Sequence, residues 1–230
     1  MEDLHRPPAL AASLPAIAIK AVTALLRGDL TQVADLFTQR QGTLESERSE
    51  YLLRCVVDDL RWLRGELHNV TQKQQEYLST DWVALLFDAD KKARATRAKT
   101  RIERIAKILC SSVRIEPTPP ADQTKEMMRI ATELTDEDVL VLKHLGEAVD
   151  KYWHLPSIAL HTLPVPDVQG VAPATVLGIC GKLQSLGLIA TAEQHSRALK
   201  LGSYPSGGGF LLLDRAEAFL MFIAERDATD

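Results

Sequence analysis

The histidines and a glycine-rich segment are the residues best suited to chemistry, and neither has the spacing of an active site. His144, His154 and His161 are separated by ten and seven residues, which fits neither a ligand pair one helical turn apart nor a zinc finger. Residues 206–209, Ser-Gly-Gly-Gly, are followed by Phe210 in place of the lysine that a phosphate-binding loop requires, so they favour a turn. These residues predict no metal and no cofactor.

The cysteines and carboxylates also lack a catalytic pattern. Cys55, Cys110 and Cys180 lie far apart and form no Cys-x-x-Cys pair, which predicts no disulfide framework and favours a reducing compartment. Each lies among apolar residues, so we expect small core side chains and not nucleophiles. Neighbouring acids such as Asp58 and Asp59 diverge on a helix and do not make an acid/base pair. The sequence therefore predicts no catalytic residues and a protein that is not an enzyme.

The strongest charge feature is a basic run over residues 91–107, where eight Lys and Arg residues are opposed by one acid, Glu103. Four arginines recur in steps of three and four, the spacing of one helix face: Arg94, Arg97, Arg101 and Arg104. Apolar residues occupy another face, so we expect a helix over about residues 90–110 with an exposed basic stripe. Such a stripe can contact nucleic-acid phosphates or another anion, lie on an anionic membrane, pair with an acidic domain, or simply be solvated.

A long helix is predicted over about residues 46–78, because apolar residues recur there in alternating steps of three and four. The seam contains Leu53, Val56, Leu60, Leu63, Leu67 and Val70. A seam of three to four heptads serves either a helical hairpin within one chain or a dimeric coiled coil, and both interpretations stay open. These six residues are candidates for a dimer seam.

The composition predicts a mainly α-helical chain of more than one part. Apolar residues make up 46% and aromatic residues 5% of the 230 residues, which favours helices packed by aliphatic side chains over a β-sandwich. Pro117, Pro119 and Pro120 cannot continue a helix. We therefore expect a helical domain over residues 1–116, a linker and connecting helix over residues 117–134, and a second domain over residues 135–230.

The first residues bear on localisation. The start, Met1-Glu2-Asp3, is acidic and lacks the basic segment of a secretion signal, which predicts a cytoplasmic protein. Residues 9–26 are apolar except for four interruptions, Ser13, Pro15, Lys20 and Thr23. These interruptions favour a buried or interfacial helix over a membrane span.

Residues 135–230 carry structural signals in a defined order. A helix opens at Thr135 with the Thr-x-x-acid spacing of a capping box. Pro173 suits the first turn of a later helix, and Gly187 suits its C-terminal stop. A strand, the glycines at 207–209, a return strand at 210–213 and a final helix opened by Asp214 follow. This order resembles the winged-helix (winged helix-turn-helix) superfamily, which implies an α+β domain with a small β-wing.

The resemblance implies a DNA reader, in which the helix that begins at Pro173 enters the major groove. Lys182 on that helix, with Arg197 and Lys200 in the wing, would then contact phosphates. However, residues 120–230 carry nine basic against fifteen acidic residues, whereas a DNA-binding surface is basic. A winged helix that binds protein is therefore an equal interpretation.

The whole chain also loosely resembles an uncharacterised family of bacterial proteins with a helical N-terminal region and a C-terminal winged helix, which implies an architecture and no activity. We expect a non-enzymatic regulator or adaptor that binds duplex DNA or a protein partner, as a monomer or a homodimer. The alternative is a protein that associates with a membrane surface through residues 9–26 and the basic stripe.

Overall fold

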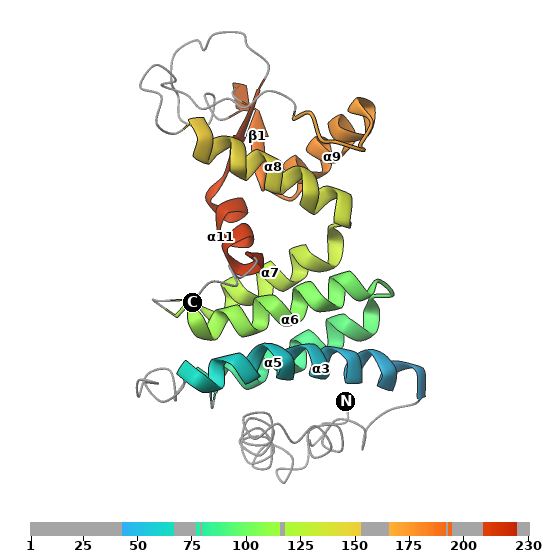
Figure 1. The fold of residues 1–230 in the computed structure, drawn as a ribbon, viewed down its shortest axis with the longest axis vertical. Helices are drawn as coiled ribbons and strands as arrows, with labels where there is room; N and C mark the ends of the chain where they lie inside the picture. The colour runs from blue at the N-terminus through green and yellow to red at the C-terminus, as the bar shows by residue number, and fades with distance from the viewer. Residues whose placement is uncertain are drawn as a thin grey trace, which may run out of the picture. The chain divides into compact units, whose positions relative to one another are not determined.

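The computed structural model describes residues 43–66, 77–78, 80–115, 118–152, 166–191, 193–194 and 209–224. This part of the chain contains seven helices and one two-stranded antiparallel sheet (Figure 1). The prediction of a mainly α-helical protein is therefore confirmed. The chain divides into two compact units, Met1–Thr132 and Glu133–Asp230. The division falls at the end of the segment that we assigned to a linker and connecting helix, so that helix belongs to the first unit.

The first unit is built on three helices that pack against one another: α3 (Thr43–Glu66), α5 (Asp81–Ala95) and α6 (Lys99–Arg114). The centre of this packing is Trp82, whose side chain is 1% exposed. Its Nε1 donates a hydrogen bond to the carbonyl oxygen of Leu109 at 3.0 Å, so α5 and α6 are joined by both packing and a polar contact. The neighbouring helix α7 (Ala121–Glu133) buries one apolar face, formed by Met127, Met128, Ile130 and Ala131.

The observed α3 covers the first part of the long helix that the heptad pattern predicts. It begins at Thr43 and extends through Glu66. Leu53 and Val56 are 3% and 0% exposed within the chain's own bundle, so these two residues serve an intramolecular contact and are not open to a dimer partner. Leu67 and Val70 lie outside the described residues, and so do the side-chain positions of Leu60 and Leu63.

The prediction of one basic helix over residues 90–110 is wrong, because the chain leaves the helix at residues 96–98. Thr96 is extended, with φ −101° and ψ 144°, and α6 begins three residues later. The reason is a change in the phase of the buried face. Ala93 and Ile102 are both buried, but nine residues at about 100° per residue would put them on opposite sides of one continuous helix. The break lets both apolar faces reach the same core.

The second unit contains α8 (Asp136–Tyr152), α9 (Pro173–Ser185) and α11 (Asp214–Ile223), with α8 packed against both other helices. Pro173 lies in the first turn of α9, as predicted. Gly187 has φ +65°, and the amides of Gly187 and Leu188 donate to the carbonyls of Gln184 and Leu183. This is the hydrogen-bond pattern with which a glycine in the left-handed region ends a helix, so the predicted helix stop is confirmed.

The sheet pairs β1 (Ile189–Thr191) with β2 (Phe210–Leu212) in antiparallel register, with Ala190 opposite Leu211. α11 follows β2 directly. The predicted cap by Asp214 is wrong, because the N-cap is Leu213, no side chain caps the helix and Asp214 is the first helical residue. Phe219 and Phe222 of α11 are fully buried and anchor this helix in the core of the unit.

Among the described residues, no helix is long and apolar enough to cross a membrane. Residues 9–26 lie outside this part of the chain.

Candidate functional site

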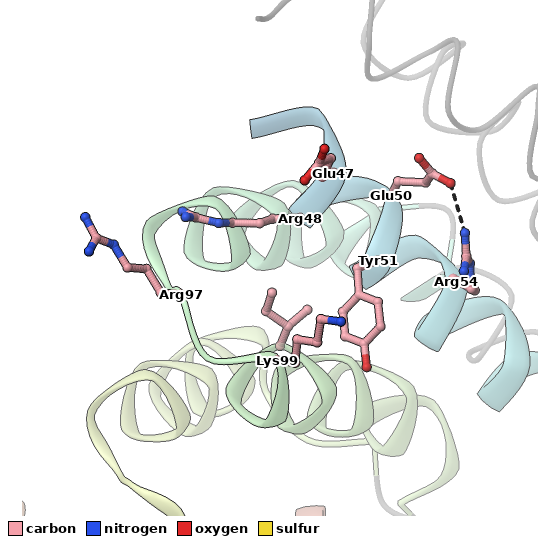
Figure 2. A pocket seen from close by; sticks show the side chains of 8 residues that line it. Glu47, Arg48, Glu50, Tyr51, Arg54, Arg97 and Lys99 are labelled. Carbon is pink, nitrogen blue, oxygen red and sulfur yellow. Dashed lines mark hydrogen bonds and ion pairs between the residues drawn. The ribbon is translucent and has the colours of Figure 1, made fainter. Parts of the chain in front are cut away.

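An open hollow on the first unit lies between the N-terminal half of α3 and the start of α6 (Figure 2). Its volume is about 390 Å³, and eight residues line it: Glu47, Arg48, Glu50, Tyr51, Arg54, Arg97, Lys99 and Ile102. Four of these residues are basic and two are acidic. Arg54 pairs with Glu50 on the same helix at 3.0 Å. The remaining lining has three cations, on Arg48, Arg97 and Lys99, against the single carboxylate of Glu47.

Each of the three cations is positioned by a different element. The Nη1 of Arg48 on α3 donates to the carbonyl oxygen of Arg94 at 2.6 Å. Lys99, the first residue of α6, places its Nζ 5.5 Å from the centre of the Tyr51 ring, which is within the range of a cation–π interaction. Arg97 lies on the link between α5 and α6 and is exposed. Figure 2 shows Arg48 and Arg97 extending to the same side, away from Tyr51 and Lys99.

Two groups at or beside the hollow, the Tyr51 hydroxyl and the Cys55 thiol, have raised pKa values. The hydroxyl of Tyr51 donates to the carboxylate of Glu103, and this hydrogen bond, together with burial, raises the pKa of Tyr51 to about 12. Burial and the nearby charge of Glu103 raise the pKa of Cys55 to about 11. At neutral pH both groups are protonated, so Cys55 lacks the thiolate that a nucleophile needs.

The predicted arginine stripe does not exist as one surface. Arg94 was expected to be exposed, but its side chain is 13% exposed and its Nη2 pairs with Asp90 at 2.5 Å. This ion pair joins residues four apart on α5 and keeps the Arg94 side chain mostly buried. The cause is again the break at residues 96–98, which separates Arg94 from the arginines that follow.

The other three arginines occupy different settings. Arg101 and Arg104 lie on α6, half-buried, and each already interacts with a neighbouring group. Arg97 is exposed and makes no hydrogen bond or ion pair with another described residue. Of the predicted stripe, only Arg97 lines the hollow. The sequence pattern did not identify Arg48, the arginine of α3 that lines the hollow together with Arg97. The two residues are 49 positions apart, and only helix packing brings them to the same hollow.

The exposed face of α9 on the second unit is uncharged. The exposed residues of this helix are Pro173, Ala174, Thr175, Leu177, Gly178, Gly181 and Ser185. Leu177 is 54% exposed, the highest value among the large apolar side chains of the described residues, ahead of Met221 on α11 at 50%. No described atom lies within 4 Å of the position that a Cβ would take at Gly178 or Gly181. Among the described residues, this face is therefore uncharged and low in relief around one projecting leucine.

Lys182, the only basic residue of α9, is bound within the unit. Its Nζ donates to the carboxylate of Asp138 and, at 2.8 Å, to the carbonyl oxygen of Glu133. Asp138 also accepts from the amide of Thr135 at 2.7 Å, while its own amide donates to the Thr135 hydroxyl at 3.2 Å. This reciprocal pair confirms the predicted capping box. The phosphate contact of Lys182 stays a prediction, and in this structure its ammonium group is paired with Asp138.

The same contacts set the ionisation of Asp138. Burial alone would raise the pKa of this carboxyl, but the hydrogen bonds from Lys182 and Thr135 outweigh it and hold the pKa below its ordinary value. Asp138 therefore stays charged at neutral pH, as the partner of Lys182. Arg197 and Lys200, the two predicted contacts in the wing, lie outside the described residues.

Within the described ranges, no three His, Cys, Asp or Glu residues gather in a way that could hold a metal ion. The fold and the two surfaces define a mainly helical protein of two units, one with a basic hollow and one with an uncharged, open helix face. Comparisons of the chain with family models, curated proteins and solved structures gave no match.

Proposed function

We propose that this chain is a non-enzymatic adaptor or regulator whose second unit is a winged-helix module that binds a protein partner through α9. The order α8, α9, β1, β2 and α11 supports the winged-helix assignment, with α9 as the counterpart of the recognition helix and the paired strands as the base of the wing. The observation that carries the proposal is the exposed face of α9, because it is uncharged and centred on Leu177.

Two features of this face favour protein over DNA. A DNA reader presents Arg, Lys, Asn or Gln to phosphates and base edges, but the exposed positions of α9 carry none of these residues and Lys182 is bound to Asp138. In addition, glycine within a helix costs about 1 kcal/mol relative to alanine. Since a Cβ at Gly178 or Gly181 would meet no atom of the described residues beyond its own helix, packing against the described residues does not explain these glycines. Close approach of a partner's backbone does.

Duplex DNA provides the first test. We expect the purified protein to show no salt-sensitive binding to random duplex DNA at low salt, measured by fluorescence anisotropy. The proposal fails if the protein binds with a steep salt dependence and if changing Arg197 and Lys200 to glutamate abolishes that binding. In that case the wing would supply the phosphate contacts that α9 lacks.

The second test is the substitution Leu177→Lys. A charge at the centre of the face should remove partner binding while leaving the fold intact, because Leu177 is 54% exposed and contributes little to the core. The measurement compares proteins that co-purify with the wild type and with the variant from lysate of the source cell, followed by titration of the purified partner. We expect at least about a tenfold loss of affinity, since an apolar anchor at an interface centre contributes 1.4 kcal/mol or more.

The matched control is Met221→Lys on α11, because Met221 is 50% exposed and equally apolar. This control should retain the partner. The pair Gly178→Ala and Gly181→Ala is a second probe: it should raise the free energy of unfolding by roughly 1–2 kcal/mol in total and still weaken the partner. Equal loss of the partner in the Leu177 and Met221 variants, or no loss in either, contradicts a docking role for α9.

A further inference from the structure

The hollow on the first unit combines features that the proposed function does not use. Its lining carries three cations against one carboxylate once the Arg54–Glu50 pair is set aside. Arg48 is fixed by its bond to the Arg94 carbonyl, and a guanidinium with one donor so occupied still has four N–H groups to offer. Arg97 makes no hydrogen bond or ion pair with another described residue. Among the described residues, the hollow therefore presents guanidinium donors of Arg48 and Arg97 that no carboxylate pairs with.

The start of α6 adds to this positive field. Ala98 is the N-cap and gives no side-chain cap, and the first turn contains no acidic residue. Lys99 instead occupies the first helical position. A cation at a helix N-terminus is unfavourable, because that end of the helix already carries a partial positive charge. Arg97 and Lys99 both lie at this end and both line the hollow, so nothing in the described lining other than Glu47 compensates their charge.

From this cavity and charge arrangement, we propose that the hollow between α3 and α6 is a binding site for a small phosphate-bearing anion, with the guanidinium groups of Arg48 and Arg97 as its ligands and Lys99 adding to the positive field from the Tyr51 side. The guanidinium groups of Arg48 and Arg97 supply directional donors suited to phosphate oxygens. Lys99 supplies a point charge, and the Tyr51 ring holds its ammonium group at the edge of the hollow. A volume of about 390 Å³ admits a pyrophosphate group.

The experiment measures binding of inorganic pyrophosphate to the full-length protein by isothermal titration calorimetry at low and at physiological salt. We expect binding that weakens as salt rises, and a loss of about tenfold or more in the variant Arg97→Glu. Because Arg97 is exposed and without a partner among the described residues, this variant should keep the wild-type circular dichroism spectrum. A second titration with ADP distinguishes a free phosphate anion from a nucleotide. Equal affinities for ADP and pyrophosphate indicate a free phosphate anion, and tighter binding of ADP indicates a nucleotide.

The matched control is Lys91→Glu, which makes the same change in net charge at an exposed position of α5 outside the hollow. This control should weaken binding much less than Arg97→Glu does, because Lys91 does not line the hollow and salt weakens the interaction between charges that are not in contact. The proposal is overturned if neither pyrophosphate nor ADP binds, or if Lys91→Glu weakens binding as much as Arg97→Glu does. The second result would mean that overall charge, and not this hollow, attracts the anion.

Discussion

Replacing Trp82 with alanine is expected to lower the free energy of unfolding of the first unit by about 3–5 kcal/mol. The indole is 1% exposed and packs where α5 meets α6, so its removal leaves a cavity that rigid helices cannot close. The substitution also removes the hydrogen bond from Nε1 to the Leu109 carbonyl. Urea unfolding followed by far-ultraviolet circular dichroism measures the change, and hydrogen exchange of peptides from α6 and α9 shows which unit is affected.

The conservative variant Trp82→Phe separates the two contributions. It keeps most of the apolar volume and loses the indole N–H, so we expect a cost of about 1–2 kcal/mol. Exchange should increase in α5 and α6 with either variant. If Trp82→Ala costs less than about 1 kcal/mol, or if the increase in exchange is confined to α9, the packing described for the first unit is wrong.

The second large effect is expected for Asp138→Ala, at about 2–3 kcal/mol in the second unit. The substitution removes the capping-box acceptor of the Thr135 amide, a loss of about 0.5–2 kcal/mol. It also leaves the ammonium group of Lys182 without its carboxylate, and removal of one member of a buried pair is strongly destabilising. We place the total below the full cost of a buried pair, because the Lys182 side chain is 37% exposed and can turn to solvent.

The variant Lys182→Met tests this division of the cost. It keeps the reciprocal bonds between Thr135 and Asp138 but leaves the Asp138 carboxylate, whose side chain is 4% exposed, without its cation, so we expect a cost of about 2–3 kcal/mol, similar to that of Asp138→Ala. A cost of Lys182→Met below about 1 kcal/mol would show that the ion pair contributes little and that the capping box accounts for most of the effect of Asp138→Ala.

The pH dependence follows from the lowered pKa of Asp138. A carboxyl whose pKa is lower in the folded than in the unfolded state binds fewer protons when folded, so folding gains stability as the pH rises. That contribution is complete above the ordinary aspartate pKa of about 3.9 and is lost as the pH falls below it towards the folded pKa. The variant Asp138→Asn should lose this part of the dependence, which urea midpoints between pH 3 and pH 6 would detect.

Features that satisfy a local backbone requirement could be predicted from the sequence. Three such features were found where they were predicted: the capping box at Thr135, the proline at the start of α9 and the glycine after its end. Each suits the unpaired backbone N–H or C=O groups at a helix terminus. The break at residues 96–98 contains no proline or glycine, so residue types alone gave no warning. The phase of the apolar residues did carry the signal, because Ala93 and Ile102 cannot share one face of a continuous helix.

The candidate sites were harder to predict, because packing brings together residues that are distant in the sequence. Lys182 is the clearest example: on its own helix it is the obvious phosphate contact, yet Asp138, 44 residues earlier, binds it. Arg48 and Lys99 likewise meet at the hollow only because α3 and α6 pack side by side. Charge spacing along one helix contains no information about such partners.

The link at residues 96–98 also determines where this chain can change in length. One residue inserted within α5 or α6 would rotate every later buried side chain of that helix by about 100°, whereas an insertion beside Arg97 would leave both helices in phase. Between the start of α5 and the end of α6, length variation during evolution is thus tolerated best at this link. Because Arg97 belongs to the hollow, such variation would alter what the hollow recognises and preserve the helical bundle, so that ligand preference and fold can diverge independently.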